Sequence, residues 1–137
     1  MPKTSNAKIK TDIKAARAMS RKELFAKCRE KLLAAKEAHL STFKAYDSVM
    51  AAQVSGDDGD VAHAIEEQDI AVTRRENILS ELKEIIEALE RLDTDAYGVC
   101  EETEENIEPE RLLAIPWTRL SLEGAVIRER DMKRQAG

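Results

Sequence analysis

The residues with the clearest chemical potential are three carboxylates, Asp57, Asp58 and Asp60, in the short segment 57–62. Carboxylate oxygens attract hard cations such as Mg²⁺ and accept hydrogen bonds from a partner. Aspartate and glycine are also the usual residues of a turn, and an aspartate often caps the helix that follows. The segment is therefore either a solvated turn or a functional tip, and the flanking elements decide how it is presented.

Two long segments of helical periodicity flank this acidic turn. Ser20 and Glu23 fit a capping box, which predicts that the first helix begins there, and the second helix is expected from about Asp60 to Leu92. Both have about thirty residues, so they can pair as an antiparallel hairpin roughly 45 Å long with the acidic turn at its far end. The predicted seam of the second helix is Ile65, Gln68, Val72, Arg75, Leu79, Leu82, Ile86 and Leu89, with Ile78, Ile85 and Leu92 beside it.

The expected fold is mainly all-α: a long antiparallel coiled-coil hairpin on a small globular base that ends in a C-terminal helix. Residues 1–19 form a basic segment, mobile or loosely helical, which is either a solvated surface or a docking patch for an acidic partner. Residues 20–92 form the arm, with its acidic tip at 54–62. Residues 93–137 form the base.

The base is expected to contain a compact segment around Trp117 and a last helix from about Thr118 to Arg134. The apolar residues of this helix are expected to pack against the foot of the arm, near Phe25 and Leu32. Those available for packing are Leu120, Leu122, Ala125, Val126 and Ile127.

Composition excludes several classes of protein. Charged residues make up 36% of the chain and the net charge is -5, which argues against DNA as the main partner. The two cysteines are far apart, and no apolar run suits a signal peptide or a membrane span, so we expect a cytoplasmic protein with reduced thiols. Only two histidines are present, with no glycine-rich phosphate loop and no nucleophile triad, so no catalytic residue is predicted and the protein is not expected to be an enzyme.

Two motifs resemble the DksA/TraR family of bacterial transcription factors. Residues 97–100, Tyr-Gly-Val-Cys, match the start of that family's zinc-finger region. The family's acidic tip motif, D-x-x-D-x-A, matches Asp57, Asp60 and Ala62. The resemblance extends over about residues 20–135 and assigns the four zinc-ligand positions to Cys100, Thr103, Ser121 and Gly124.

The resemblance implies a function as well as a fold. Family members bind RNA polymerase rather than DNA, insert the arm through the secondary channel and destabilise promoter open complexes in the stringent response. Asp57, Asp60 and Ala62 would then form the tip near the catalytic centre, where carboxylates could bind cations or mobile catalytic elements. Arg74 and Arg75 are either solvated charges or contacts with the polymerase channel.

The same resemblance predicts that zinc is absent. One thiolate with two hydroxyls and a glycine cannot supply four tetrahedral ligands, so the lost metal-binding energy must be replaced by packing. The expected apolar replacements are Leu112, Leu113, Ile115, Trp117, Leu120 and Leu122. Cys100 is either a buried relic or a redox-sensitive thiol with a lowered pKa; the neighbouring glutamates would raise its pKa, which favours the relic.

Cooperation with the alarmone ppGpp stays open. Typical members use basic residues at positions that correspond to Glu84, Ile115 and Ala125 here, and none of these is basic. Arg119 and Arg128 are nearby alternatives. Two other functions compete: a Gre-type transcript-cleavage factor, and a non-enzymatic helical adaptor or coiled-coil dimer. Polar residues interrupt the predicted apolar seams of both long helices, which favours an intramolecular hairpin and hence a monomer.

Overall fold

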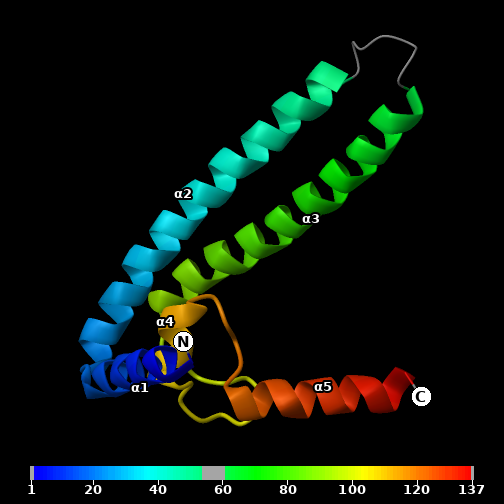
Figure 1. Ribbon diagram of the computed structural model, residues 1–137. Helices are drawn as coiled ribbons and strands as arrows, with labels where there is room; N and C mark the ends of the chain where they lie inside the picture. Colours follow the sequence, from blue (N-terminus) through cyan, green and yellow to red (C-terminus); the bar gives the residue numbers. More distant parts are fainter. Residues whose placement is uncertain (1, 54–60, 137) are drawn as a thin grey trace. The chain divides into compact units, whose positions relative to one another are not determined.

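The computed structural model of this chain describes residues 2–53 and 61–136, with side chains from 7 to 49 and from 69 to 136. The predicted tip residues Asp57 and Asp60 therefore lie outside the described part. The described helices, labelled in Figure 1, are α1 (Pro2–Ala18), α2 (Arg21–Gln53), α3 (Val61–Leu92), α4 (Pro109–Ala114) and α5 (Leu122–Ala136). Within these ranges there is no strand, only a single antiparallel bridge between Val99 and Asn106, so the mainly all-α prediction is confirmed.

The chain divides into two compact units. One contains Met1–Leu33 and Glu87–Gly137, and the other is Ala34–Ile86. The second unit contains the C-terminal part of α2 and the N-terminal part of α3. None of the helices, over the residues described, is long and apolar enough to cross a membrane.

In the second unit, α2 and α3 pair as an antiparallel hairpin. His39 Nε2 lies 2.7 Å from a carboxylate oxygen of Glu81, and Arg75 Nε donates a 3.1 Å hydrogen bond to Asp47. Moving from His39 to Asp47 along α2 means moving back from Glu81 to Arg75 along α3. This order defines antiparallel pairing and confirms the predicted hairpin.

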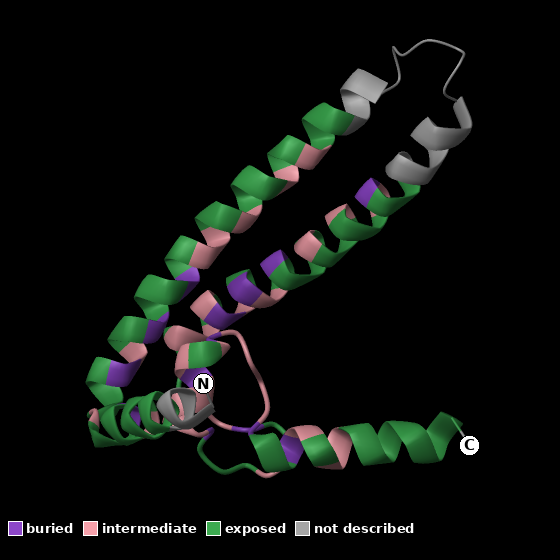
Figure 2. Cartoon of the chain, viewed as in Figure 1, coloured by how far each residue is buried: buried purple, intermediate pink, exposed green. Residues whose placement is uncertain are grey.

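The predicted seam of α3 is confirmed at Leu82 and wrong at two other positions. Leu82 is 7% exposed, whereas the predicted Leu79 and Ile86 are 39% and 38% exposed and Ile85, beside the seam, is 0% exposed. Figure 2 shows the buried positions as a narrow stripe along one side of α3. Two adjacent apolar pairs, 78/79 and 85/86, allow the stripe to be drawn in either of two phases, and the first member of each pair is the more buried.

In the first unit, the basic N-terminal segment forms α1 and packs against α4. Ala16 is buried at their contact, and Arg17 forms a 2.7 Å ion pair with Glu110. A break at residues 19–20 follows α1. There the Ser20 hydroxyl accepts a 3.2 Å hydrogen bond from the Glu23 amide, as a helix-capping serine does, so the predicted start of the long helix is confirmed.

Tyr97 forms the centre of the first unit's core. Its ring packs edge to face on Phe25, with 4.9 Å between ring centroids, and its hydroxyl donates a 2.7 Å hydrogen bond to the Pro116 carbonyl. The other large side chains of this unit that are fully buried are Cys28, Leu32, Cys100, Ile107 and Leu112.

The packing predicted for the last helix is wrong in part. α5 begins at Leu122 rather than near Thr118, and Leu122 and Val126 are 62% and 57% exposed. Gly124 is the one buried residue among those described in α5. The helix therefore contacts the core through its first turn, where a residue without a side chain allows a close approach.

Candidate functional site

The segment that carries Cys100 is a tight loop, residues 99–106, here called the Cys100 loop. The Cys100 amide donates to the Glu105 carbonyl at 2.8 Å, and the Glu104 amide donates to the Cys100 carbonyl at 2.9 Å. Just before the loop, Gly98 has φ 79°, and a Cβ there would lie 2.9 Å from the Phe25 ring. Glycine is required at this position by both backbone conformation and space.

The four positions assigned to zinc ligands meet where the Cys100 loop faces the start of α5. Cys100 and Ser121 are 1% and 5% exposed, and the Ser121 hydroxyl donates to the Cys100 sulfur at 3.4 Å. The same hydroxyl accepts a 3.0 Å hydrogen bond from the Gly124 amide, so Ser121 caps the N-terminus of α5. Thr103 contributes a further hydrogen bond to Cys100.

Gly124 fits this arrangement because it has no side chain. A Cβ built on it would lie 2.3 Å from the Cys100 sulfur and 3.3 Å from the Ser121 hydroxyl. The first of these distances is far inside van der Waals contact. The sulfur therefore occupies the space into which a fourth ligand would project.

These residues do not fit a four-ligand zinc site. The donors are one sulfur and two hydroxyls, the fourth position offers no side chain, and a structural zinc site needs four ligands of the thiolate, imidazole or carboxylate kind. In the part of the chain that the structure describes, no group of three or more His, Cys, Asp or Glu residues could hold a metal. The Ser121 hydroxyl contacts Cys100 at this position. Of the predicted apolar replacements, Leu112 is fully buried, whereas Leu122 is exposed and is not among them.

The prediction that the neighbouring glutamates raise the pKa of the Cys100 thiol is also wrong. Burial raises its pKa, but hydrogen bonds from the side chains and amides of Ser121 and Thr103 outweigh burial and lower the pKa to about 6. The glutamates expected to raise it direct their carboxylates elsewhere: Glu101 and Glu102 form ion pairs with arginines. Cys100 is therefore a buried, acidic thiol.

Sequence reasoning missed the ion-pair network beside the Cys100 loop. Arg119 pairs with Glu87 of α3 and, at 3.0 Å, with Glu101. Arg128 of α5 pairs with Glu102 at 3.0 Å and with Glu101 at 3.5 Å. The available signal was the run of glutamates after Cys100 and the two arginines that flank positions 121 and 124. The two alternative alarmone contacts are therefore engaged within the molecule.

The second cysteine has a different environment. Cys28 of α2 is fully buried, and its thiol donates a 3.7 Å hydrogen bond to the Leu112 carbonyl. Burial is the main cause that raises the pKa of Cys28. This thiol stays protonated and acts as a small core residue.

The predicted arm residues differ in their surroundings. Arg74 is exposed, whereas Arg75 is half-buried, hydrogen-bonded to Asp47 and stacked over the Phe43 ring at 4.8 Å from its centroid. Arg75 therefore has a role inside the hairpin, and its contact with a polymerase stays a prediction. Ala62 belongs to the first turn of α3.

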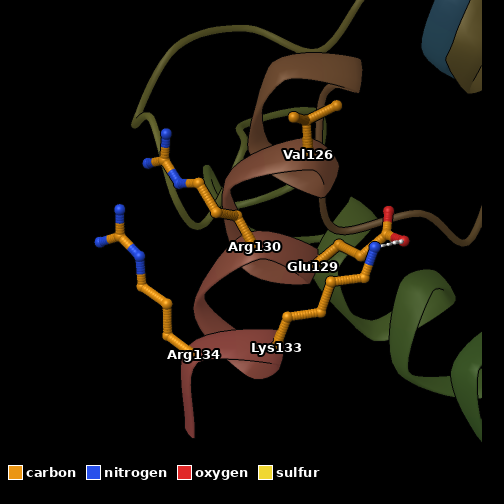
Figure 3. Close-up of a pocket in the computed structure, with 5 residues that line it drawn as sticks. All are labelled: Val126, Glu129, Arg130, Lys133 and Arg134. Atoms are coloured by element: carbon orange, nitrogen blue, oxygen red, sulfur yellow. Dashed lines mark ion pairs between the residues drawn. The ribbon is translucent and has the colours of Figure 1, made fainter. Parts of the chain in front are cut away.

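The far part of α5 presents charge rather than a core face. Figure 3 shows Arg130 and Arg134 projecting from the helix while Lys133 pairs with Glu129 one turn earlier, at 3.5 Å. Val126 lies at the upper end of this shallow surface and is exposed. The surface belongs to one helix and connects no other element.

A family model and a solved structure indicate one family. Residues 96–130 match the prokaryotic dksA/traR C4-type zinc finger, although this stretch contains a single cysteine, Cys100. An uncharacterized protein of Aquifex aeolicus (strain VF5) is 31% identical over 117 residues, 80% of this chain and 79% of the relative. General stress protein 16O of Bacillus subtilis (strain 168) is 38% identical over 55 residues, 40% of this chain and 34% of the relative.

A solved structure extends this likeness to the fold. The transcription factor DksA2 from Pseudomonas aeruginosa superposes with a TM-score of 0.77 at 25% sequence identity. The match covers 91% of this chain and 98% of that one. The two proteins therefore share their fold over nearly the whole length of both chains.

Proposed function

Because this chain belongs to the DksA/TraR family of transcription factors, we propose that it binds RNA polymerase and modulates transcription initiation through its helical hairpin. The hairpin would enter the secondary channel, as in the family that the sequence resembles. The proposed activity is regulatory and not catalytic.

The observation that carries this proposal is the antiparallel pairing of α2 and α3. The two helices have 33 and 32 residues and are joined by residues 54–60, which contain Asp57 and Asp60. Cross-helix contacts at His39–Glu81 and Arg75–Asp47 hold them in register. A paired hairpin of this kind would deliver the carboxylates of its connecting segment into a narrow channel.

We propose that the protein acts without zinc. The support is the poor fit of the donor set, together with the close approach of the Gly124 backbone to the Cys100 sulfur. An elemental analysis that finds one zinc per purified chain would contradict this part of the proposal.

We propose that polymerase is recognised by a single chain and without direct DNA binding, in keeping with a net charge of -5. Direct cooperation with ppGpp is proposed to be weak, because Glu84, Ile115 and Ala125 replace basic residues and Arg119 and Arg128 already pair with glutamates. Transcription assays with and without ppGpp test this: a large enhancement by ppGpp would contradict it.

The tip is tested with Asp60→Asn, which removes one carboxylate and keeps the size of the side chain. We expect binding to core RNA polymerase to persist and the effect on promoter open complexes to be lost. Asp69→Asn, on an exposed residue of α3, is the matched control and should keep both properties. Equal loss of binding and regulation in Asp60→Asn would indicate an anchor, and stimulated cleavage of stalled transcripts would indicate a Gre-type factor.

A further inference from the structure

We infer that an ion-pair network does the cross-linking that zinc does in a C4 finger. The network, here called the clasp, consists of Glu87, Glu101, Glu102, Arg119 and Arg128. It ties the Cys100 loop to α3 and α5. This inference rests on the proposed absence of zinc and adds to it the means by which the loop is held.

The clasp joins the same segments that a metal would join. Zinc ligands at positions 100 and 103 belong to the Cys100 loop, and those at 121 and 124 belong to the start of α5. In the clasp, Glu101 and Glu102 extend from the same loop to Arg119, two residues before position 121, and to Arg128, four residues after position 124. The connection through Glu87 adds α3, which no zinc ligand would reach.

The members of the clasp share charges instead of forming separate pairs. Arg119 lies between Glu87 and Glu101, and Glu101 lies between Arg119 and Arg128. Their side chains are 28–43% exposed, and the Glu101 amide also donates a 3.0 Å hydrogen bond to the Arg119 carbonyl. An isolated surface pair contributes little, whereas a shared and partly buried network anchored by backbone contacts resists opening more strongly.

The ion pair between Lys133 and Glu129 gives a contrast within α5. Its side chains are 78% and 70% exposed, and both residues lie on the same helix one turn apart. Such a pair ties no loop to any other element. Lys133→Gln is therefore a matched control: it removes one positive charge from α5 without touching the clasp.

Hydrogen exchange in the full-length protein tests the clasp directly. The variant Arg119→Gln/Arg128→Gln removes both cations. We expect exchange at the Cys100, Glu104 and Ile107 amides, whose hydrogen bonds close the loop, to become on the order of tenfold faster. Raising the salt concentration should accelerate exchange at the same amides in the unmodified protein. Lys133→Gln should leave their exchange unchanged.

Reversing the charges of Arg128 and Glu102 provides a second test, which works even if the double glutamine variant folds poorly. Arg128→Glu places a third carboxylate beside Glu101 and Glu102 and should lower the melting temperature by about 2–4 °C. Glu102→Arg should lower it similarly. Their combination restores an opposite-charge pair and should recover at least half of the loss and the slow loop exchange.

Two results would overturn the clasp. One is hydrogen exchange of the loop amides in the double glutamine variant equal to that in Lys133→Gln. The other is a melting temperature that does not recover when Arg128→Glu and Glu102→Arg are combined. Zinc content and core RNA polymerase binding, measured on the same samples, report separately on the proposed function. One zinc per chain, or no polymerase binding, would contradict that proposal while leaving the exchange result readable.

Discussion

The acidity of the Cys100 thiol gives the protein a specific dependence of stability on pH. The folded pKa of about 6 lies below the ordinary value of 9.0. Between these values the unfolded chain binds a proton that the folded chain does not, so the free energy of unfolding rises with pH. The contribution is complete above about pH 9 and is lost as pH falls through about 6.

Urea denaturation between about pH 6 and about pH 8 measures this effect. The unmodified protein should gain up to a few kcal/mol across the interval, and Cys100→Ala should remove most of that slope. Cys28→Ala should keep it, because burial raises the pKa of Cys28 and that thiol stays protonated here. An equal slope in Cys100→Ala would show that the thiol is not ionised in the folded protein.

We predict that Gly124 tolerates no side chain, because the Cys100 sulfur occupies the space that a side chain would need. Gly124→Ala brings a methyl group to within 2.3 Å of the Cys100 sulfur before any relaxation, so it should destabilise the protein by roughly 1–3 kcal/mol. In a Cys100→Ala background the same change should cost less than half as much. A double-mutant cycle by thermal or urea denaturation measures the difference, and additive effects would contradict the predicted contact.

The family resemblance assigned Cys100, Thr103, Ser121 and Gly124 to one site, and they do meet. It did not indicate the acidity of the thiol, because the sequence shows the charges of Glu101 and Glu102 but not the arginines that pair with them. Arg119 and Arg128 lie 18 and 26 residues away from those glutamates, so their pairing depends on the folded positions of the loop and α5. The capping role of Ser121 likewise required the start of α5.

Among the helices, the hairpin depends on a polar contact in its middle. Arg75→Ala removes the hydrogen bond to Asp47 and the stacking on Phe43, and should destabilise the protein by about 0.5–1.5 kcal/mol. Arg74→Ala, one residue away and exposed, should change stability by less than about 0.5 kcal/mol. Chemical denaturation compares them, and the reverse order would contradict the described register.

Helix periodicity predicted the existence and pairing of α2 and α3 but not the exact face of α3. A run with neighbouring apolar residues, as at 78/79 and 85/86, permits two phases, and burial of Ile85 rather than Ile86 is decided by the partner helix. The last helix shows the opposite limit. Leu122 and Val126 suggested a core face, yet both are exposed, and Gly124 is the buried residue among those described in α5.

For the molecule as a whole, family membership and the local chemistry lead to different expectations about metal. The matched family is described by a C4-type zinc finger, whereas this chain has one cysteine within the matched residues 96–130. Its first unit instead has a hydrogen-bonded thiol, a capped helix, an ion-pair network and a core centred on Tyr97. Treatment with a strong chelator should therefore leave its melting temperature unchanged.

The most direct test is binding of the chelator-treated, full-length protein to core RNA polymerase, with zinc counted in the same preparation of the free protein. The account predicts a stable complex formed by a protein that carries no stoichiometric zinc. Failure to bind under conditions in which the protein is folded, or binding that returns only when zinc is added, would contradict it.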